Sequence, residues 1–128
     1  MNNEDIIKYK SLYLQTSWGY LNMLRKNIAF LLHGRSATSA VDSAHLAAHS
    51  LKSQSILMGY TKIGELCEEM EHIFQESKQN SAVPDEEILK IMLESLKTIQ
   101  LSLTQISENA KELDLSEETD RLRRRYGK

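Results

Sequence analysis

The chain has 128 residues, of which 41% are hydrophobic and 27% charged, so it can form one domain with a single sizeable core. The net charge of −2 provides no general attraction for nucleic acid or for an anionic membrane surface. A single cysteine, Cys67, excludes an internal disulfide, and no apolar run is long enough to cross a bilayer. The composition therefore predicts a cytoplasmic protein without nucleic-acid or membrane partners.

The first predicted helix is about thirty residues long, which is enough for one end to extend past a bundle of ordinary helices. Asn2 or Asn3 is expected to cap it, because a side-chain oxygen there can accept a hydrogen bond from the first turn. Gly34 is typical of the position just past a helix, so the helix is expected to end at His33. Its apolar stripe comprises Ile7, Leu14, Leu21, Leu24, Ile28 and Leu31.

A second helix follows the predicted polar connection from Arg35 to Thr38. Thr38 or Ser39 is expected to cap this helix and Gly59 to end it. At helical spacing the sequence separates into two faces. The inner face is made of small and apolar residues, namely Ala44, Ala48, Leu51, Ser55 and Met58. The outer face comprises Asp42, His45, His49, Lys52, Ser53 and Ile56. A closely packed helix would thus present His49 to solvent from a rigid support.

Two further amphipathic helices are predicted. Thr61 is expected to cap the third helix, Ser77 to Val83 to form a polar loop, and Pro84 to begin a fourth helix that ends near residue 112. The core stripe of the third helix is Ile63, Leu66, Cys67, Met70, Ile73 and Phe74, and its acidic outer face carries Glu65, Glu68, Glu69 and Glu71. The core stripe of the fourth helix is Ile88, Met92, Leu96, Ile99, Leu103 and Ile106.

Four amphipathic helices joined by short loops, without a strand pattern, predict an all-α protein folded as an antiparallel up-down four-helix bundle over residues 1–112. Residues 113–128 are expected to form a short C-terminal helical extension that begins at Ser116. The extension is either a fifth helix folded on the bundle or the start of a linker into a longer protein. The isolated domain is expected to be monomeric.

The segment from Ala48 to Tyr60, AHSLKSQSILMGY, resembles the signature of histidine phosphotransfer (HPt) domains, most closely the N-terminal phosphotransfer domain of CheA-type chemotaxis kinases. The matching positions are a histidine, an aliphatic residue two positions on, a lysine three on and a glycine ten on, which here are His49, Leu51, Lys52 and Gly59. The chain departs from the signature at Ser53, where the family usually has a glycine that lets a partner approach closely. The resemblance covers residues 4–112 and implies the same bundle fold.

The resemblance implies that His49 accepts a phosphoryl group from a histidine kinase catalytic domain and passes it to a receiver-domain aspartate. A neutral imidazole is a good nucleophile near neutral pH. CheA-type members carry a glutamate on the third helix that holds the histidine ring, and Glu71 falls at the matching offset. Lys52, one turn from His49, could neutralise phosphoryl oxygens. His45, Ser53 and Ile56 are expected to form the docking face, and Gly59 to have a structural role.

The sequence contains neither a glycine-rich nucleotide loop nor a Mg²⁺ carboxylate cluster, so the chain is expected to need no cofactor or metal of its own and to leave ATP binding to the kinase. Two alternatives stay open. Because of Ser53, the domain could be a degenerate docking module that binds a receiver or kinase without accepting phosphate. His45 and His49, four residues apart, could instead chelate a metal ion in a helix bundle. The sequence also does not decide between a free-standing protein and the N-terminal piece of a CheA-like kinase.

Overall fold

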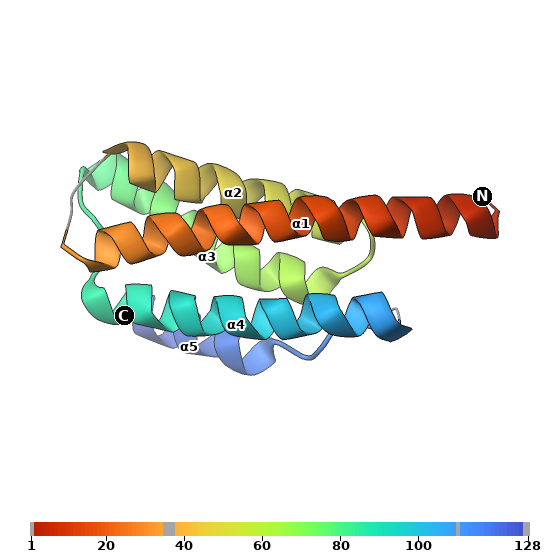
Figure 1. The fold of residues 1–128 in the computed structure, drawn as a ribbon. Helices are drawn as coiled ribbons and strands as arrows, with labels where there is room; N and C mark the ends of the chain where they lie inside the picture. The colour runs from red at the N-terminus through yellow and green to blue at the C-terminus, as the bar shows by residue number, and fades with distance from the viewer. Residues whose placement is uncertain (1, 35–37, 110, 127–128) are drawn as a thin grey trace.

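The computed structural model describes residues 2–34, 38–109 and 111–126 of the chain. In this part of the chain all regular structure is helical, which confirms the predicted all-α class. The helices are α1 (Asn3–Leu32), α2 (Thr38–Leu57), α3 (Thr61–Asn80), α4 (Glu86–Asn109) and α5 (Ser116–Tyr126). Successive helices run in opposite directions, and the N-terminal end of α1 projects past the others (Figure 1). The arrangement is consistent with an up-down bundle.

The packing order of the helices differs from a closed ring of four. Helix α2 lies between α1 and α3, and α1 also packs on α4, whereas α3 and α4 make few contacts with each other. Helix α5 packs against both α3 and α4, and Figure 1 shows it running alongside α4. The C-terminal extension is therefore a helix folded on the bundle in the described residues.

Helix α1 begins and ends as predicted. The side chain of Asn2 accepts a hydrogen bond from the backbone N–H of Asp5 at 2.8 Å, and His33 is the C-terminal cap. The predicted stripe is wrong at its start, because Ile7 is 67% exposed on the projecting end of the helix. Tyr13, which lies outside that stripe, is buried instead.

The starts of α2 and α3 differ from the predicted caps. Thr38 is already the first residue of α2, and residues 35–37 of the predicted connection lie outside the described residues. Thr61 is the first residue of α3 rather than its cap, and Tyr60 in the cap position makes no side-chain capping bond. The carboxylate of Glu112, far along the chain, accepts hydrogen bonds from the first turn of α3 instead.

The connection between α3 and α4 is shorter than predicted. Helix α3 continues to Asn80 and ends at Ser81, whose φ of 52° is left-handed, so the loop does not start at Ser77. Asp85 caps α4 by accepting a hydrogen bond from the N–H of Ile88 at 2.9 Å. Pro84 therefore precedes the cap and is not the first residue of the helix. Helix α4 ends at Asn109, earlier than predicted.

Candidate functional site

His49 lies midway along α2 on a helix face supported by small buried residues. Ala44, Ala48 and Leu51 are completely buried, so α2 packs closely on its neighbours. The side chain of His49 is 52% exposed on the opposite face. The inner and outer faces of α2 are thus separated as helical spacing predicts, and the imidazole is accessible from solvent.

One carboxylate holds the ring of His49. The Nδ1 atom lies 2.6 Å from Oε2 of Glu71 on α3. Because an ionised carboxylate only accepts hydrogen bonds, this contact places the ring proton on Nδ1. In the neutral ring Nε2 then keeps its lone pair. The contact between α2 and α3 therefore selects the tautomer whose outward nitrogen is nucleophilic.

Lys52 shares the same carboxylate. Its ammonium Nζ lies 2.6 Å from Oε1 of Glu71, whose side chain is only 13% exposed. Burial raises the pKa of Glu71, but hydrogen bonds from Lys52 and His49, together with their charges, outweigh burial and hold the pKa below its usual value. Glu71 is thus a carboxylate at neutral pH. The ammonium group of Lys52 is therefore paired with the Glu71 carboxylate in this structure.

A shallow hollow surrounds these three residues between α2 and α3. It is lined by His45, Leu46, His49, Lys52, Glu71, His72 and Gln75. Partial burial and the nearby charge of Lys78 lower the pKa of His45, so this second histidine is neutral near pH 7. Leu46, His72 and Gln75 are not among the site residues that the sequence predicts. Helical spacing could have found Leu46, which precedes His49 by three positions and is 57% exposed.

The three remaining positions predicted for the site follow His49 along the chain, two of them on α2 and the third just past its end. Ser53 is exposed and Ile56 is 48% exposed. A Cβ added at Gly64 of α3 would lie 2.6 Å from Cγ1 of Ile56, so Gly64 makes room for the Ile56 side chain. Gly59 has a φ of 87° where α2 ends, a conformation that strains residues with a side chain. Its placement fits the structural role expected from the sequence.

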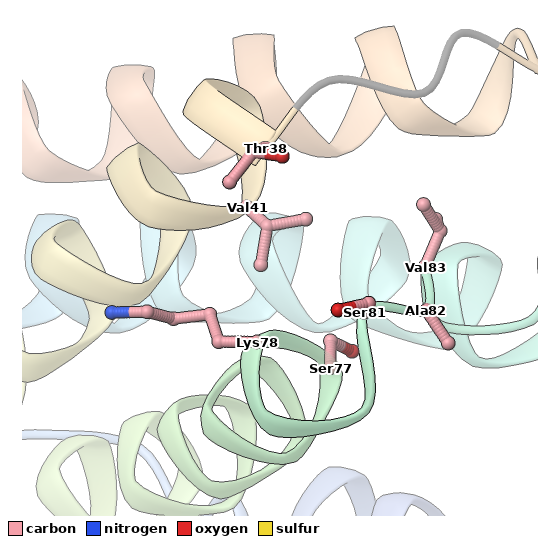
Figure 2. A pocket seen from close by; sticks show the side chains of 7 residues that line it. All are labelled: Thr38, Val41, Ser77, Lys78, Ser81, Ala82 and Val83. Atoms are coloured by element: carbon pink, nitrogen blue, oxygen red, sulfur yellow. The ribbon is translucent and has the colours of Figure 1, made fainter.

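A second hollow lies at the start of α2, about 16 Å along the helix axis from His49. Figure 2 shows the side chains that line it, which are Thr38, Val41, Ser77, Lys78, Ser81, Ala82 and Val83. Its volume of about 110 Å³ is small compared with the roughly 300–1,000 Å³ of typical ligand pockets. It contains neither the exposed imidazole nor the carboxylate described above, so the candidate site is the hollow at His49.

The metal-binding alternative finds no support in the structure. Among the described residues, no group of three or more His, Cys, Asp or Glu side chains is placed to hold a metal ion. His45 and His49 share a helix face, but the carboxylate beside them is bonded to His49 and Lys52. As for membranes, none of the described helices combines the length and the apolarity needed to span a bilayer.

An accessible nucleophilic nitrogen on a closely packed helix, held by a partly buried carboxylate, suits a module that carries a chemical group between partners. The family model of the Hpt domain matches residues 8–123, which is most of the chain and extends into α5. The chain therefore belongs to the Hpt domain family and has a phosphotransfer role in a phosphorelay. No curated protein and no solved structure was found to match it.

Proposed function

We propose that His49 is the phosphoacceptor, which takes a phosphoryl group from a histidine kinase catalytic domain and passes it to the aspartate of a receiver domain. The observation that carries this proposal is the 2.6 Å contact between Nδ1 of His49 and Glu71. This contact leaves Nε2 as the reactive nitrogen of a half-exposed ring. The other histidine on the same helix, His45, has no carboxylate partner of this kind among the contacts described.

The proposed reaction has two steps at Nε2. In the first, the lone pair attacks the terminal phosphorus of ATP bound by the kinase; the new P–N bond forms as the P–O bond to ADP breaks. The ring then carries positive charge, which the Glu71 carboxylate stabilises through the Nδ1 proton. In the second step a receiver carboxylate oxygen attacks phosphorus and the P–N bond breaks. The ring returns to its neutral state.

The proposed role of Lys52 follows from its position one turn from His49. Its ammonium balances the charge of Glu71 and can also attract phosphoryl oxygens that arrive at Nε2. His45, Ser53 and Ile56, joined by exposed Leu46, are proposed to form the docking face around the acceptor. In this proposal the domain is monomeric and cytoplasmic, and ATP is bound by the kinase.

The kinship with CheA-type chemotaxis kinases is part of the same proposal. It rests on the motif at His49, Lys52 and Gly59 and on the carboxylate of Glu71, which lies on the third helix at the offset that the CheA-type resemblance implies. If it is right, the catalytic domain of a CheA-type kinase should be a competent phosphate donor.

The test is phosphorylation of the full chain by a histidine kinase catalytic domain with radiolabelled ATP. We expect an acid-labile, base-stable label that is lost in His49→Gln and retained in His45→Gln, its matched control on the same helix. Label that persists in His49→Gln would overturn the assignment. A chain that binds receiver domains but takes no label from a kinase that phosphorylates other HPt domains would be the degenerate docking module instead.

A further inference from the structure

Helix α3, which carries Glu71, is held on two sides by different helices. One side packs against α2, where His49 and Lys52 lie. The side away from α2 packs against α5, while direct contact with α4 is slight (Figure 1). Because α3 has little direct contact with α4, its position against α2 depends on α5, which packs on both α3 and α4.

Helix α5 is anchored by an apolar face. Leu122 and Leu115, the residue just before the helix, are completely buried and Thr119 is 3% exposed, at the four- and three-residue spacing of one helix face. The two leucines belong to the same buried cluster as the core residues of α3 and α4. Removing one of them would leave a cavity where α5 packs against α3 and α4.

Polar contacts connect the C-terminal segment, residues 111–126, to α3 at two places. The carboxylate oxygens of Glu112 accept hydrogen bonds from the backbone N–H groups of Lys62 and Ile63, each at 3.1 Å, which satisfies two free donors in the first turn of α3. Near the middle of α3, Nε of Arg123 donates to Glu69 at 3.0 Å. Both the N-terminal end and the middle of α3 are thus held by hydrogen bonds to the C-terminal segment.

Glu69 and Glu71 point to opposite sides of α3. Glu69 pairs with Arg123 of α5, while Glu71 contacts His49 and Lys52 of α2 at 2.6 Å each. Contacts this short lose their geometry when a helix shifts by a fraction of a turn. We infer that α5 is a positioning element of the phosphotransfer site, which keeps Glu71 within hydrogen-bonding reach of His49. This inference rests on the proposed role of His49.

The test is Leu122→Ala in the full chain, with two kinds of measurement. In ¹³C NMR titrations of the Glu71 carboxyl group, we expect the pKa of Glu71 to rise toward its ordinary value as its partners loosen. We also expect phosphorylation of His49 by a kinase catalytic domain to slow by roughly tenfold. Leu122→Met, which conserves volume, should restore both measurements.

Arg124→Ala is the matched control, because it removes an exposed charge from α5 without touching the buried face. It should change neither measurement. If Leu122→Ala does not fold, Leu122→Val removes less of the same buried side chain of α5 and is tested in the same way. A folded variant with an unchanged Glu71 titration and an unchanged rate would overturn the role of α5. A wild-type chain that takes no phosphate, but whose Glu71 pKa rises in Leu122→Ala, would overturn the proposed function alone.

Discussion

At the scale of single residues, the site is organised by one carboxylate with two partners. Each oxygen of Glu71 has a different task, because Oε2 orients the His49 ring while Oε1 pairs with Lys52. Without the lysine, Glu71 would be a partly buried carboxylate with His49 as its one remaining partner, and burial would favour its protonated form. Lys52 therefore acts on His49 partly through Glu71.

Lys52→Met tests this coupling. Methionine keeps much of the packing of the lysine stem but removes its charge, so the pKa of Glu71 should rise. The pKa of Glu71 in the folded chain is lowered from 4.5. Its ionisation therefore stabilises the fold above that pH, and the stabilisation is lost as pH falls through the lower folded value. In the variant, loss of both stability and His49 phosphorylation should begin at a higher pH.

The measurements are a ¹³C carboxyl titration of Glu71, together with unfolding and phosphorylation measured from neutral pH down to below 4.5. Lys90→Met is the control, because Lys90 pairs with Glu86 on the exposed surface of α4, away from the site. An unchanged Glu71 titration in Lys52→Met would show that the lysine does not set the ionisation of the carboxylate.

Ser53 is the residue at which the chain departs from the HPt signature, and its position on the exposed face predicts a steric effect. Ser53→Tyr should leave the fold intact, because the added ring points to solvent. If a receiver must approach this face, transfer from phosphorylated His49 should slow by roughly tenfold or more. Lys97→Tyr, at an exposed position of α4, is the control, and stopped-flow transfer rates are the measurement. Equal rates in both variants would place the docking face elsewhere.

At the scale of helices, the approach of α2 to α3 depends on Gly64. Ala at this position would bring a Cβ to 2.6 Å from Ile56, a branched side chain with few alternative rotamers. Overpacking of this kind costs about 1–3 kcal/mol, against a gain of about 1 kcal/mol for Ala over Gly in a helix. We expect Gly64→Ala to lower the free energy of unfolding by about 1 kcal/mol.

Gly19→Ala provides the matched comparison, because nothing lies within 4 Å of an added Cβ on α1 at that position. Only the helix-propensity term remains there, so the variant should be more stable by about 1 kcal/mol. Urea unfolding of both variants measures the two changes. The same sign of change in both would mean that Gly64 is not a close-approach position.

Helix spacing predicted most of the fold because buried stripes repeat locally along the chain. The stripes of α3 and α4 are buried as expected. Contacts between distant residues could not be predicted this way. Glu112 caps α3 from about fifty residues away, and the hydroxyl of Tyr13 pairs with buried Ser55 at 2.8 Å. Neither contact has a local signal in the sequence, which is why helical spacing predicts Thr61 as the cap of α3 and does not place Tyr13 in the core.

The candidate site was predictable to a similar extent. The motif around His49 predicts the site residues on α2, and the offset that the family resemblance implies on the third helix predicts Glu71. The structure brings Glu71 into contact with His49. Spacing could not show that Lys52 shares this carboxylate, because that contact depends on the rotation of α3 against α2. For the same reason His72 and Gln75, which line the hollow from α3, were not foreseen.

At the scale of the whole molecule, the sequence pattern leaves open whether residues 113–128 fold on the bundle of residues 1–112 or begin a separate linker. The packing of α5 argues for one cooperative unit. On its surface, Arg121 forms an ion pair with Glu94 of α4 and Arg125 forms one with Glu87. Exposed ion pairs of this kind contribute little to the free energy of unfolding. The buried leucines contribute more, because their removal opens the core.

Leu115→Ala decides between these descriptions. If α5 is part of one cooperative unit, the variant should lose about 2–5 kcal/mol of unfolding free energy, and Trp18 fluorescence on α1 should report the same midpoint as far-UV circular dichroism. Leu101→Ala, at a position that is 60% exposed on α4, should change stability by less than about 0.5 kcal/mol. A separate extension would instead leave the Trp18 midpoint unchanged, because α1 and α4 would unfold without sensing the loss at Leu115.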